Sequence, residues 1–335
     1  MINTAIAKLA AGQNLAGTET REAFDHIMSG GATNAQIAAF ITAMRMKGET
    51  IDEITACAQV LREKCSRIHT QGDVLDIVGT GGDCANTFNI STTSAFVISA
   101  AGQPVAKHGN RSVSSKSGAA DVLEALGVKI DLPAEKNEEL LQKINLCFLF
   151  AQSCHASMRY AGPVRKEIGI RTIFNIIGPL ANPAFASLQL LGVYQKELVL
   201  PLARVLSNLG VKRGIVVYGN DGLDEVTVSS TNTMAEINNG KVTEYIFDPA
   251  DLGFKRCSKA DLVGGDAQEN AQITTNILNG TERGSKRDAV VLNSAVSLYL
   301  GGKGSIKECA ALAEETIDSG RAYEKLQQLV KLSNM

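Results

Sequence analysis

The chain has 335 residues, of which 33 are Lys or Arg and 35 are Asp or Glu, so its formal net charge is −2. Hydrophobic residues make up 44% and charged residues 20%, a mix that excludes a disordered chain and indicates about two packed domains. The balanced charge, with aromatic residues at only 5% and no Trp, argues against a basic or base-stacking surface for nucleic acid.

The cysteines and the apolar segments bear on where the protein works. The seven cysteines are odd in number and no two have CxxC spacing, so neither a structural zinc site nor a disulfide framework is expected. Free cysteines are typical of the reducing cytoplasm, where we expect this protein to work. No signal peptide is expected, and no apolar run reaches the ~18 residues that cross a bilayer, so no membrane contact is predicted.

Residues 1–66 repeat apolar side chains at helical spacing. The pattern predicts helices over Ala23–Met28, Asn34–Lys47 and Thr50–Lys64, with a capping signal at Thr18 ahead of the first. No residue of this segment suggests catalysis. Its wide apolar faces suit either a small domain or a dimerisation surface, and we expect a homodimer that forms through this region.

From residue 73 onward, short apolar runs alternate with helical segments, which is typical of an α/β domain with a mainly parallel sheet. The expected strands are Val74–Val78, Val105–Ala106, Cys147–Ala151, Leu188–Val193, Gly214–Tyr218, Met234–Ile237 and Val242–Ile246. The expected helices are Asn89–Ala101, Gly118–Leu126, Glu135–Ile144, Leu198–Leu209, Ala267–Leu278, Arg287–Leu300 and Ile306–Ser319.

The strongest chemical signal is the glycine-rich segment Gly79–Asp83, which directly follows the first predicted strand. Glycines let backbone N–H groups turn toward a ligand, and the helix that begins near Asn89 offers free N–H groups to an anion. The hydroxyls of Ser91 and Thr92 add donors, and Ser91 could also bind a metal. The alternative is a capped helix after an ordinary βα turn, and the segment matches neither the Rossmann nor the P-loop pattern.

A second polar segment, Lys107–Lys116, follows the next predicted strand. Its cationic residues, serines and glycine suit phosphate recognition at the carboxyl end of a sheet, and the alternative is a solvated basic loop. His108 is the only histidine in such ligand-like surroundings, and the role of His155 is undecided. Two loops of this chemistry after neighbouring strands favour the phosphate interpretation.

Two further segments carry charged side chains in a suggestive context. Asp224 and Glu225 end a loop that follows an apolar strand, where they can hold a Mg²⁺ ion that also binds a phosphorylated substrate. Arg165 lies beside an apolar stretch and could bind a small carboxylate through its planar fork. The alternatives are a turn with surface acids for the first and a salt-bridged helix end for the second.

Together these motifs resemble the anthranilate phosphoribosyltransferases of tryptophan biosynthesis. They are GTGGD at 79–83, TFNIST at 87–92, KHGNRSVSS at 107–115, SGAADVLEALG at 117–127, RKEIGIRTIFNIIGPLANP at 165–183 and GNDGLDE at 219–225. The resemblance covers essentially the whole chain in the family's order. It implies transfer of the phosphoribosyl group of 5-phosphoribosyl 1-pyrophosphate (PRPP) to the amine of anthranilate, which gives N-(5-phosphoribosyl)anthranilate and pyrophosphate in the second step from chorismate.

The resemblance also implies a fold and a division into domains. We expect a small all-helical domain at residues 1–70, joined by a helical segment near 160–183. A large α/β domain with a mainly parallel central sheet is expected at 71–335, an architecture shared with nucleoside phosphorylases. Family members are usually dimeric through the helical part, and any complex with anthranilate synthase is left open.

Carried over residue by residue, the resemblance implies roles for individual side chains. PRPP binding is assigned to Gly79, Gly82, Asp83, Thr87, Asn89, Ile90, Ser91, Thr92, Lys107, His108, Gly109, Asn110, Arg111, Ser112, Val113, Ser114, Ser115 and Ala119. Anthranilate binding is assigned to Gly79, Asn110 and Arg165. One Mg²⁺ is assigned to Ser91 and a second to Asp224 with Glu225, and the catalytic roles to Lys107 and Asp83. Ala119 is a departure, because family members often carry Ser there and its hydroxyl contact is lost.

Two other functions fit parts of the pattern. A pyrimidine-nucleoside phosphorylase shares the architecture but needs no Mg²⁺, so the adjacent acids Asp224 and Glu225 disfavour it. A non-catalytic relative that binds nucleic acid would require a basic surface and eroded phosphate loops, which this sequence does not have.

Overall fold

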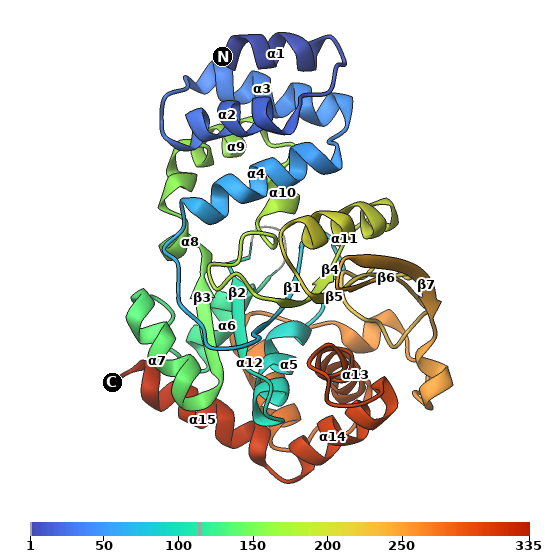
Figure 1. The fold of residues 1–335 in the computed structure, drawn as a ribbon. Helices are drawn as coiled ribbons and strands as arrows, with labels where there is room; N and C mark the ends of the chain where they lie inside the picture. Colours follow the sequence, from blue (N-terminus) through green and yellow to red (C-terminus); the bar gives the residue numbers. More distant parts are fainter. Residues whose placement is uncertain (1, 113–115) are drawn as a thin grey trace.

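The computed structural model describes residues 2–112 and 116–335, and it has a helical part stacked on an α/β part (Figure 1). The helical part contains α1 (Ile2–Ala10), α2 (Gly17–Met28), α3 (Asn34–Lys47), α4 (Ile51–Glu63), α9 (Gly162–Ile168) and α10 (Phe174–Ile177). Threonine side chains cap two of these helices, because Thr33 accepts a hydrogen bond from the Gln36 N–H and Thr50 from the Glu53 N–H.

Residues from two distant parts of the chain build the core of the helical part. Phe24 of α2 packs on Phe174 of α10 with ring centroids 5.5 Å apart. Ala161, Val164 and Leu180 are buried in the same hydrophobic cluster as the N-terminal helices. The chain therefore returns to the helical part after the third strand of the sheet.

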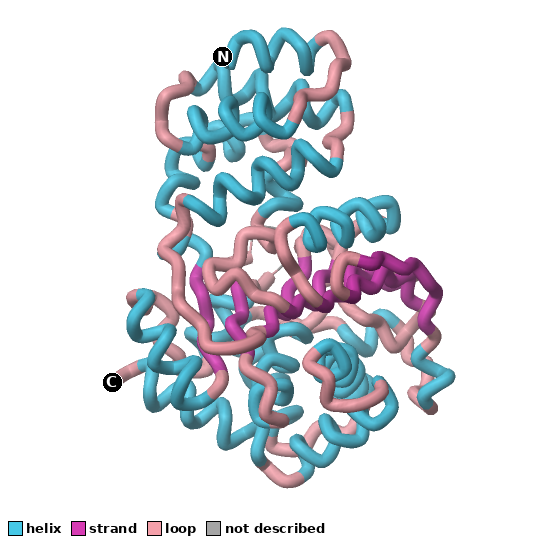
Figure 2. The backbone as a smooth tube through the Cα atoms, viewed as in Figure 1, coloured by secondary structure: helices cyan, strands magenta, loops and turns pink. Residues whose placement is uncertain are grey.

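One seven-stranded sheet forms the centre of the α/β part, with helices on both sides (Figure 2). Its strands are β1 (Leu75–Gly79), β2 (Val105–Gly109), β3 (Leu146–Phe150), β4 (Leu188–Gly192), β5 (Arg213–Gly219), β6 (Asn232–Asn238) and β7 (Lys241–Phe247), in the spatial order β3-β2-β1-β4-β5-β6-β7. The first five strands are parallel, and β6 and β7 add an antiparallel hairpin at one edge. Continuous burial along β3 and β4 is typical of parallel strands covered on both faces.

The remaining helices divide between the two faces of the sheet. In β5, Ile215 and Val217 belong to the cluster of α5 and α13, whereas Val216 belongs to the cluster of α11 and the helical part. This alternation is the period-two pattern of a strand. The helices of the α/β part are α5 (Ile90–Ala100), α6 (Ala119–Ala125), α7 (Ala134–Ile144), α8 (Ala151–Cys154), α11 (Val199–Asn208), α12 (Ala267–Leu278), α13 (Ser285–Leu300), α14 (Ile306–Asp318) and α15 (Arg321–Ser333).

The predicted fold class is confirmed, and the differences lie in individual elements. The first predicted helix begins earlier than expected, at Gly17. Helix α15 was not predicted, although Ala322, Leu326 and Leu329 are buried at helical spacing and the signal was available. Among the helices that the described residues form, none is long and apolar enough to cross a membrane.

Candidate active site

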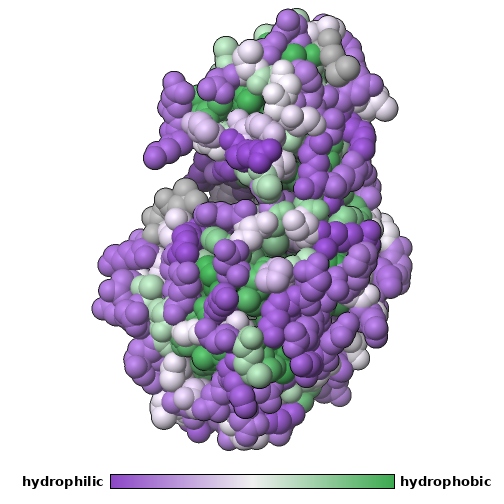
Figure 3. All heavy atoms as spheres, turned by 90° about the vertical axis from the view of Figure 1, so that its left-hand side faces the viewer, coloured by the Kyte–Doolittle hydropathy of each residue, from purple (hydrophilic) through white to green (hydrophobic). Residues whose placement is uncertain are grey.

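The polar segments singled out in the sequence lie at one edge of the sheet. Strands β1, β2, β4 and β5 are parallel and each ends in a glycine, at Gly79, Gly109, Gly192 and Gly219. Because the carboxyl ends of parallel strands meet at the same edge, the loops that follow these glycines converge. Figure 3 shows a hollow in the surface between the helical part and the α/β part.

Asp224 is packed against the ends of two neighbouring strands. A Cβ atom at Gly79 would collide with its carboxylate, and one at Gly192 would collide with its backbone carbonyl. The Gly81 N–H, in a left-handed backbone conformation, donates a hydrogen bond of 2.6 Å to Asp224 Oδ2. The glycines thus make room for a carboxylate from β5's loop inside the glycine-rich segment.

The carboxylates at this edge of the sheet are buried close to one another, which disfavours their charged forms. Burial, followed by the charge of Asp83, raises the pKa of Asp224 to about 7. Burial and the charge of Asp224 raise the pKa of Glu225 to about 8. These side chains are not surface acids, so the alternative interpretation of this loop is wrong. Like-charged oxygens held together out of water favour binding of a cation.

Lys107 lies between the acids and the start of α5. Its ammonium is buried and donates to the Ile77 carbonyl at 2.6 Å and to Ser91 Oγ at 3.1 Å. Burial lowers the pKa of Lys107, and the carboxylates of Asp76 and Glu225 oppose that effect. The alternative interpretation of this segment was a solvated basic loop. It is wrong for Lys107, because a solvated loop would not bury its lysine.

The first turn of α5 contributes donors to the same place. The Ser91 N–H donates to Glu225 Oε1 at 3.3 Å, so the helix start and the acidic loop are in contact. Ile90 and Thr92 are buried, and Asn89 is the N-cap residue. Thr87 pairs with Val263 in an isolated antiparallel bridge just before the helix.

His108 points into the interior rather than into solvent. Its ring and that of His155 meet edge to face with centroids 5.1 Å apart, and both side chains are buried. Burial holds the pKa of His108 well below its usual value, and burial lowers that of His155 to about 4. Both rings are therefore neutral at pH 7, which makes them packing and hydrogen-bonding groups rather than cations for a phosphate.

The loop after β2 divides its side chains between the site and the neighbouring helix. Arg111 donates to Glu124 and Asp121 of α6 and lies over the Phe150 ring, so its charge is already paired. Asn110 accepts from the Arg111 N–H at 2.8 Å and from Gln152 at 3.3 Å. The Ser112 N–H donates to Asp121 Oδ2, and Ala119 opens α6. Val113, Ser114 and Ser115, which were predicted to bind PRPP, lie outside the described residues.

Arg165 lies on α9, on the side of the helical part. Its guanidinium is 5.0 Å from the centroid of the Phe174 ring, and burial lowers its pKa. It takes part in no ion pair within residues 2–112 and 116–335, so it is not the salt-bridged helix end that was the alternative. A half-buried arginine with only an aromatic face beside it can still accept a carboxylate.

Comparisons with known proteins decide the family. Residues 3–65 match the model of the glycosyl transferase family helical bundle domain, and residues 71–323 match that of the glycosyl transferase family a/b domain. The chain is 60% identical, over its whole length and 98% of the relative's, to anthranilate phosphoribosyltransferase of Ruminiclostridium cellulolyticum. The identity is 56% with the enzyme of Methanobrevibacter smithii, over all of both chains. The chain belongs to the anthranilate phosphoribosyltransferase family.

Solved structures of family members are similar throughout. Anthranilate phosphoribosyltransferase from Thermus thermophilus superposes with a TM-score of 0.94 at 40% identity, covering 99% of each chain. The enzyme from Saccharomyces cerevisiae, solved in complex with PRPP and Mg, superposes with a TM-score of 0.92 at 28% identity over 99% of this chain and 98% of that one. The same yeast enzyme has also been solved with 4-fluoroanthranilate.

The donor set at the sheet edge fits Mg²⁺. Carboxylates of Asp224 and Glu225 and the Ser91 hydroxyl are hard oxygen ligands, and burial together with a neighbouring carboxylate raises the pKa of both acids, which a bound cation would counteract. No three His, Cys, Asp or Glu side chains converge as a ligand set in the part of the chain that the structure describes. That matches how Mg²⁺ is commonly held, by one or two carboxylates together with substrate phosphates.

Two residues that organise this site, Asp76 and Arg171, were not predicted from the sequence. Asp76 in β1 is fully buried and accepts from the His108 N–H at 3.1 Å, and burial raises its pKa to about 6. Arg171 stacks on Tyr194 at 4.3 Å and donates to the Gly82 carbonyl at 2.5 Å, which ties the helical part to the glycine-rich segment. In the sequence, Asp76 is a single polar residue in an apolar strand, and Arg171 is one residue of the longer motif at 165–183.

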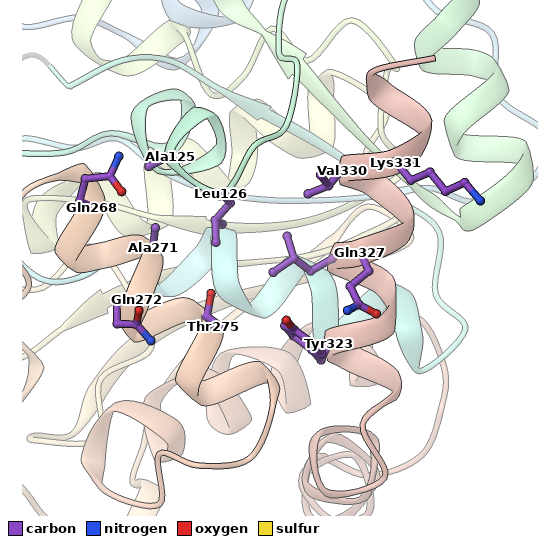
Figure 4. A pocket seen from close by; sticks show the side chains of 11 residues that line it. Ala125, Leu126, Gln268, Ala271, Gln272, Thr275, Tyr323, Gln327, Val330 and Lys331 are labelled. Carbon is purple, nitrogen blue, oxygen red and sulfur yellow. The ribbon is translucent and has the colours of Figure 1, made fainter.

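Two cavities elsewhere contain none of the predicted site residues. One of about 490 Å³ lies between α12 and α15, where Gln268 and Gln272 face Tyr323 and Gln327 (Figure 4). The other, of about 360 Å³, lies beside residues 66–68 and the start of α7. Neither contains an acid–lysine arrangement like that at the sheet edge.

Proposed function

We propose that this chain transfers the 5-phosphoribosyl group of PRPP to the amine of anthranilate and releases pyrophosphate, as in tryptophan biosynthesis. The observation that carries the proposal is the convergence of the glycine-rich segment, the start of α5, the buried Lys107 and the acids Asp224 and Glu225 at one sheet edge. An anionic sugar diphosphate that arrives with Mg²⁺ matches this charge pattern.

The chemistry asks the protein mainly to position and to stabilise charge. The aryl amine is a weak base that is neutral at pH 7, so it can attack ribose C1 without a strong protein base. As the C1–O bond to pyrophosphate breaks, C1 gains oxocarbenium character and negative charge grows on the leaving group. Lys107, held in place by Ser91 and the Ile77 carbonyl, is oriented to stabilise that charge.

The residue roles follow the sequence assignments. Ser91 would hold one Mg²⁺ and Asp224 with Glu225 a second, so we propose two ions per chain. Mg²⁺ bound with the diphosphate offsets negative charge on the leaving group. Arg165 would bind the anthranilate carboxylate, with Asn110 and Gly79 beside the same substrate. Asp83 keeps the catalytic role of the sequence assignment, and its charge acts on Asp224, whose pKa it raises.

The remaining contacts with PRPP are proposed for the segments on either side of α5 and β2. They are Gly82, Thr87, Asn89, Ile90, Thr92, His108, Gly109, Arg111, Ser112, Val113, Ser114, Ser115 and Ala119. For His108 and Arg111 the backbone is the better candidate, because one ring is buried and neutral and the other side chain is already paired. Ala119 can offer only its N–H.

We also propose the division at residue 70, a homodimer and a cytoplasmic location. The exposed face of α1 and α3 carries Ala7, Ala10, Ala35, Ala39 and Met46, and Met46 is 81% exposed. Small and apolar residues on one face suit a helix interface between two copies. Light scattering should give twice the chain mass of 35.5 kDa at micromolar concentration, and a monomer would contradict the dimer.

A direct assay tests the activity itself. The purified chain is mixed with anthranilate, PRPP and Mg²⁺, and the fluorescence of anthranilate is followed. We expect its loss to need all three additions and to stop in excess chelator. Stable fluorescence with all three present would contradict the proposed activity. If a second assay then showed that the chain consumes orthophosphate together with a nucleoside, the phosphorylase alternative would be favoured.

A further inference from the structure

A chain of three hydrogen bonds runs through two side-chain amides behind the start of α5. The Gly265 N–H donates to Asn270 Oδ1 at 2.8 Å, and Asn270 Nδ2 donates to Asn89 Oδ1 at 3.0 Å. Asn89 Nδ2 then donates to the Ser117 carbonyl at 3.2 Å. These contacts join the segment before α12, the N-cap of α5 and the segment before α6.

The direction of this relay is fixed at both ends. A backbone N–H such as that of Gly265 can only donate, and a backbone carbonyl such as that of Ser117 can only accept. Each amide must therefore point its oxygen toward Gly265 and its nitrogen toward Ser117. Asn270 is 1% exposed, so water does not compete for the two bonds that its own amide makes.

The relay changes what the N-cap residue of α5 does. An N-cap Asn ordinarily accepts a hydrogen bond from the N–H of the second or third residue of its own helix. In the described chain, Asn89 makes no such capping bond; its amide is turned so that its oxygen faces Asn270 and its nitrogen faces the Ser117 carbonyl. Of the first three N–H groups of α5, that of Ile90 donates to the Phe88 carbonyl at 2.7 Å and that of Ser91 donates to Glu225 at 3.3 Å, so within the described residues the Thr92 N–H is the one left for another acceptor.

One further contact holds α12 against α5. One turn along each helix, Thr274 Oγ1 and Thr93 Oγ1 are hydrogen-bonded at 2.9 Å, and both side chains are fully buried. Because residues four apart share a helix face, Asn270 and Thr274 form one polar contact with α5. These two contacts, one turn apart, therefore fix the position of α12 along α5.

The segment before α12 is also paired with the chain that leads into α5. The Phe88 N–H donates to the Leu262 carbonyl at 3.1 Å and the Gly264 N–H to the Asn86 carbonyl at 2.9 Å. A Cβ atom at Gly264 would collide with the backbone of Phe88. This close antiparallel pairing places Gly265 where it can orient the Asn270 amide.

We propose that Asn270 is a positioning residue for the diphosphate of PRPP, acting through Asn89. By turning the Asn89 amide toward α12, Asn270 keeps that side chain from capping α5 and leaves the Thr92 N–H available to a phosphate oxygen. The proposal rests on the proposed function, since it assumes that PRPP binds at the start of α5. It predicts a defect confined to PRPP, because the hydrogen bonds of Asn270 lead to the start of α5, whereas Arg165 lies on α9 in the helical part.

The test is a double-mutant cycle on the Michaelis constants. Asn270→Ala should raise the KM for PRPP roughly 3- to 10-fold, the effect of one buried hydrogen bond, and leave the KM for anthranilate unchanged. In an Asn89→Ala background the same substitution should have no further effect on the KM for PRPP, because the competing cap is gone. Asn270→Ser, a smaller change, serves if Asn270→Ala folds poorly.

The matched control is Asn137→Ala. Asn137 is also a buried helical asparagine whose Nδ2 contacts backbone carbonyls, of Leu132 and Pro133, but it lies on α7. It should lose stability without a change in the KM for PRPP. Equal effects of Asn270→Ala in the two backgrounds, or no effect in either, would overturn the proposal while the function stands. A wild-type chain that neither binds PRPP nor consumes anthranilate would overturn the function instead.

Discussion

In the helical part, a buried carboxylate has a partner for each oxygen, whereas at the sheet edge several carboxylates share one buried ammonium. Glu53 is fully buried, and it accepts from Lys47 and the Thr50 N–H on one oxygen and from the Leu15 N–H on the other. These bonds outweigh burial, so the pKa of Glu53 is lowered.

At the sheet edge the balance is reversed. Lys107 is the shared cation for Asp76, Asp224 and Glu225, and the pKa values of all three acids are raised. The Lys47–Glu53 pair holds a loop and two helices together. The two charges neutralise each other, so neither is available to bind a ligand. The sheet edge keeps an excess of negative charge that folding alone does not explain, which is the pattern of a site built for a cation and its anionic substrate.

The first prediction concerns the buried Lys47–Glu53 pair. If this pair can be removed without a loss of stability, the contrast between the helical part and the sheet edge fails. Glu53→Ala leaves the Lys47 ammonium buried without its carboxylate, and we expect the free energy of unfolding to fall by about 3–5 kcal/mol. Denaturant unfolding measures this loss. The control is Glu63→Ala, which breaks an exposed pair with Arg21 and should cost at most about 1 kcal/mol. Equal losses would mean that the buried pair is not special.

The second prediction concerns the sheet edge and its buried cation, Lys107. Lys107→Met keeps the length of the side chain and removes the charge that, in the proposed function, faces the leaving group. Turnover should fall roughly 10²- to 10³-fold, the usual effect of losing one preorganised electrostatic donor. Lys212→Met removes a surface lysine that pairs with Asp73 and should leave turnover unchanged. An unchanged turnover in Lys107→Met would remove Lys107 from the site.

Under the proposed function, Arg165 binds only one of the two substrates. Arg165→Ala should raise the KM for anthranilate about 10- to 150-fold, because a charge-assisted contact of about 1.5–3 kcal/mol is lost, and should leave the KM for PRPP nearly unchanged. Arg165→Lys keeps the charge without the planar fork, so its KM for anthranilate should lie between the two. A rise confined to the KM for PRPP would move Arg165 to the phosphate loops.

Much of the architecture could be predicted because it depends on local patterns. Apolar runs ending in glycine located β1, β4 and β5, and the glycine-rich and acidic loops pointed to the site. The missed features depend on contacts between distant segments. Asn270 meets Asn89 across the α12–α5 interface, and Arg171 reaches Gly82 from the helical part. No local periodicity marks such pairs, and burial of His108 likewise follows from packing against His155.

The smallest expected effect tests the central claim. The claim is that the buried acids Asp224 and Glu225 destabilise the folded chain electrostatically until a cation and its anionic substrate bind. In the folded chain the pKa values of Asp224 and Glu225, about 7 and 8, lie above their ordinary values of 3.8 and 4.5. A folded-state pKa above the unfolded value gives stability that is complete below the unfolded value and lost as pH rises through the folded one. The chain without metal should therefore become less stable between pH 6 and pH 8.5.

The decisive measurement is the melting temperature of the wild type and of Asp224→Asn/Glu225→Gln at pH 6 and pH 8.5, with chelator or with Mg²⁺ and PRPP. In chelator, the wild type should lose a few degrees on going to pH 8.5, and the double variant should lose less. Mg²⁺ with PRPP should restore the wild type at pH 8.5 and have little effect on the variant. A wild type whose melting temperature does not change with pH, or a variant stabilised by Mg²⁺ and PRPP as strongly as the wild type, would contradict the account.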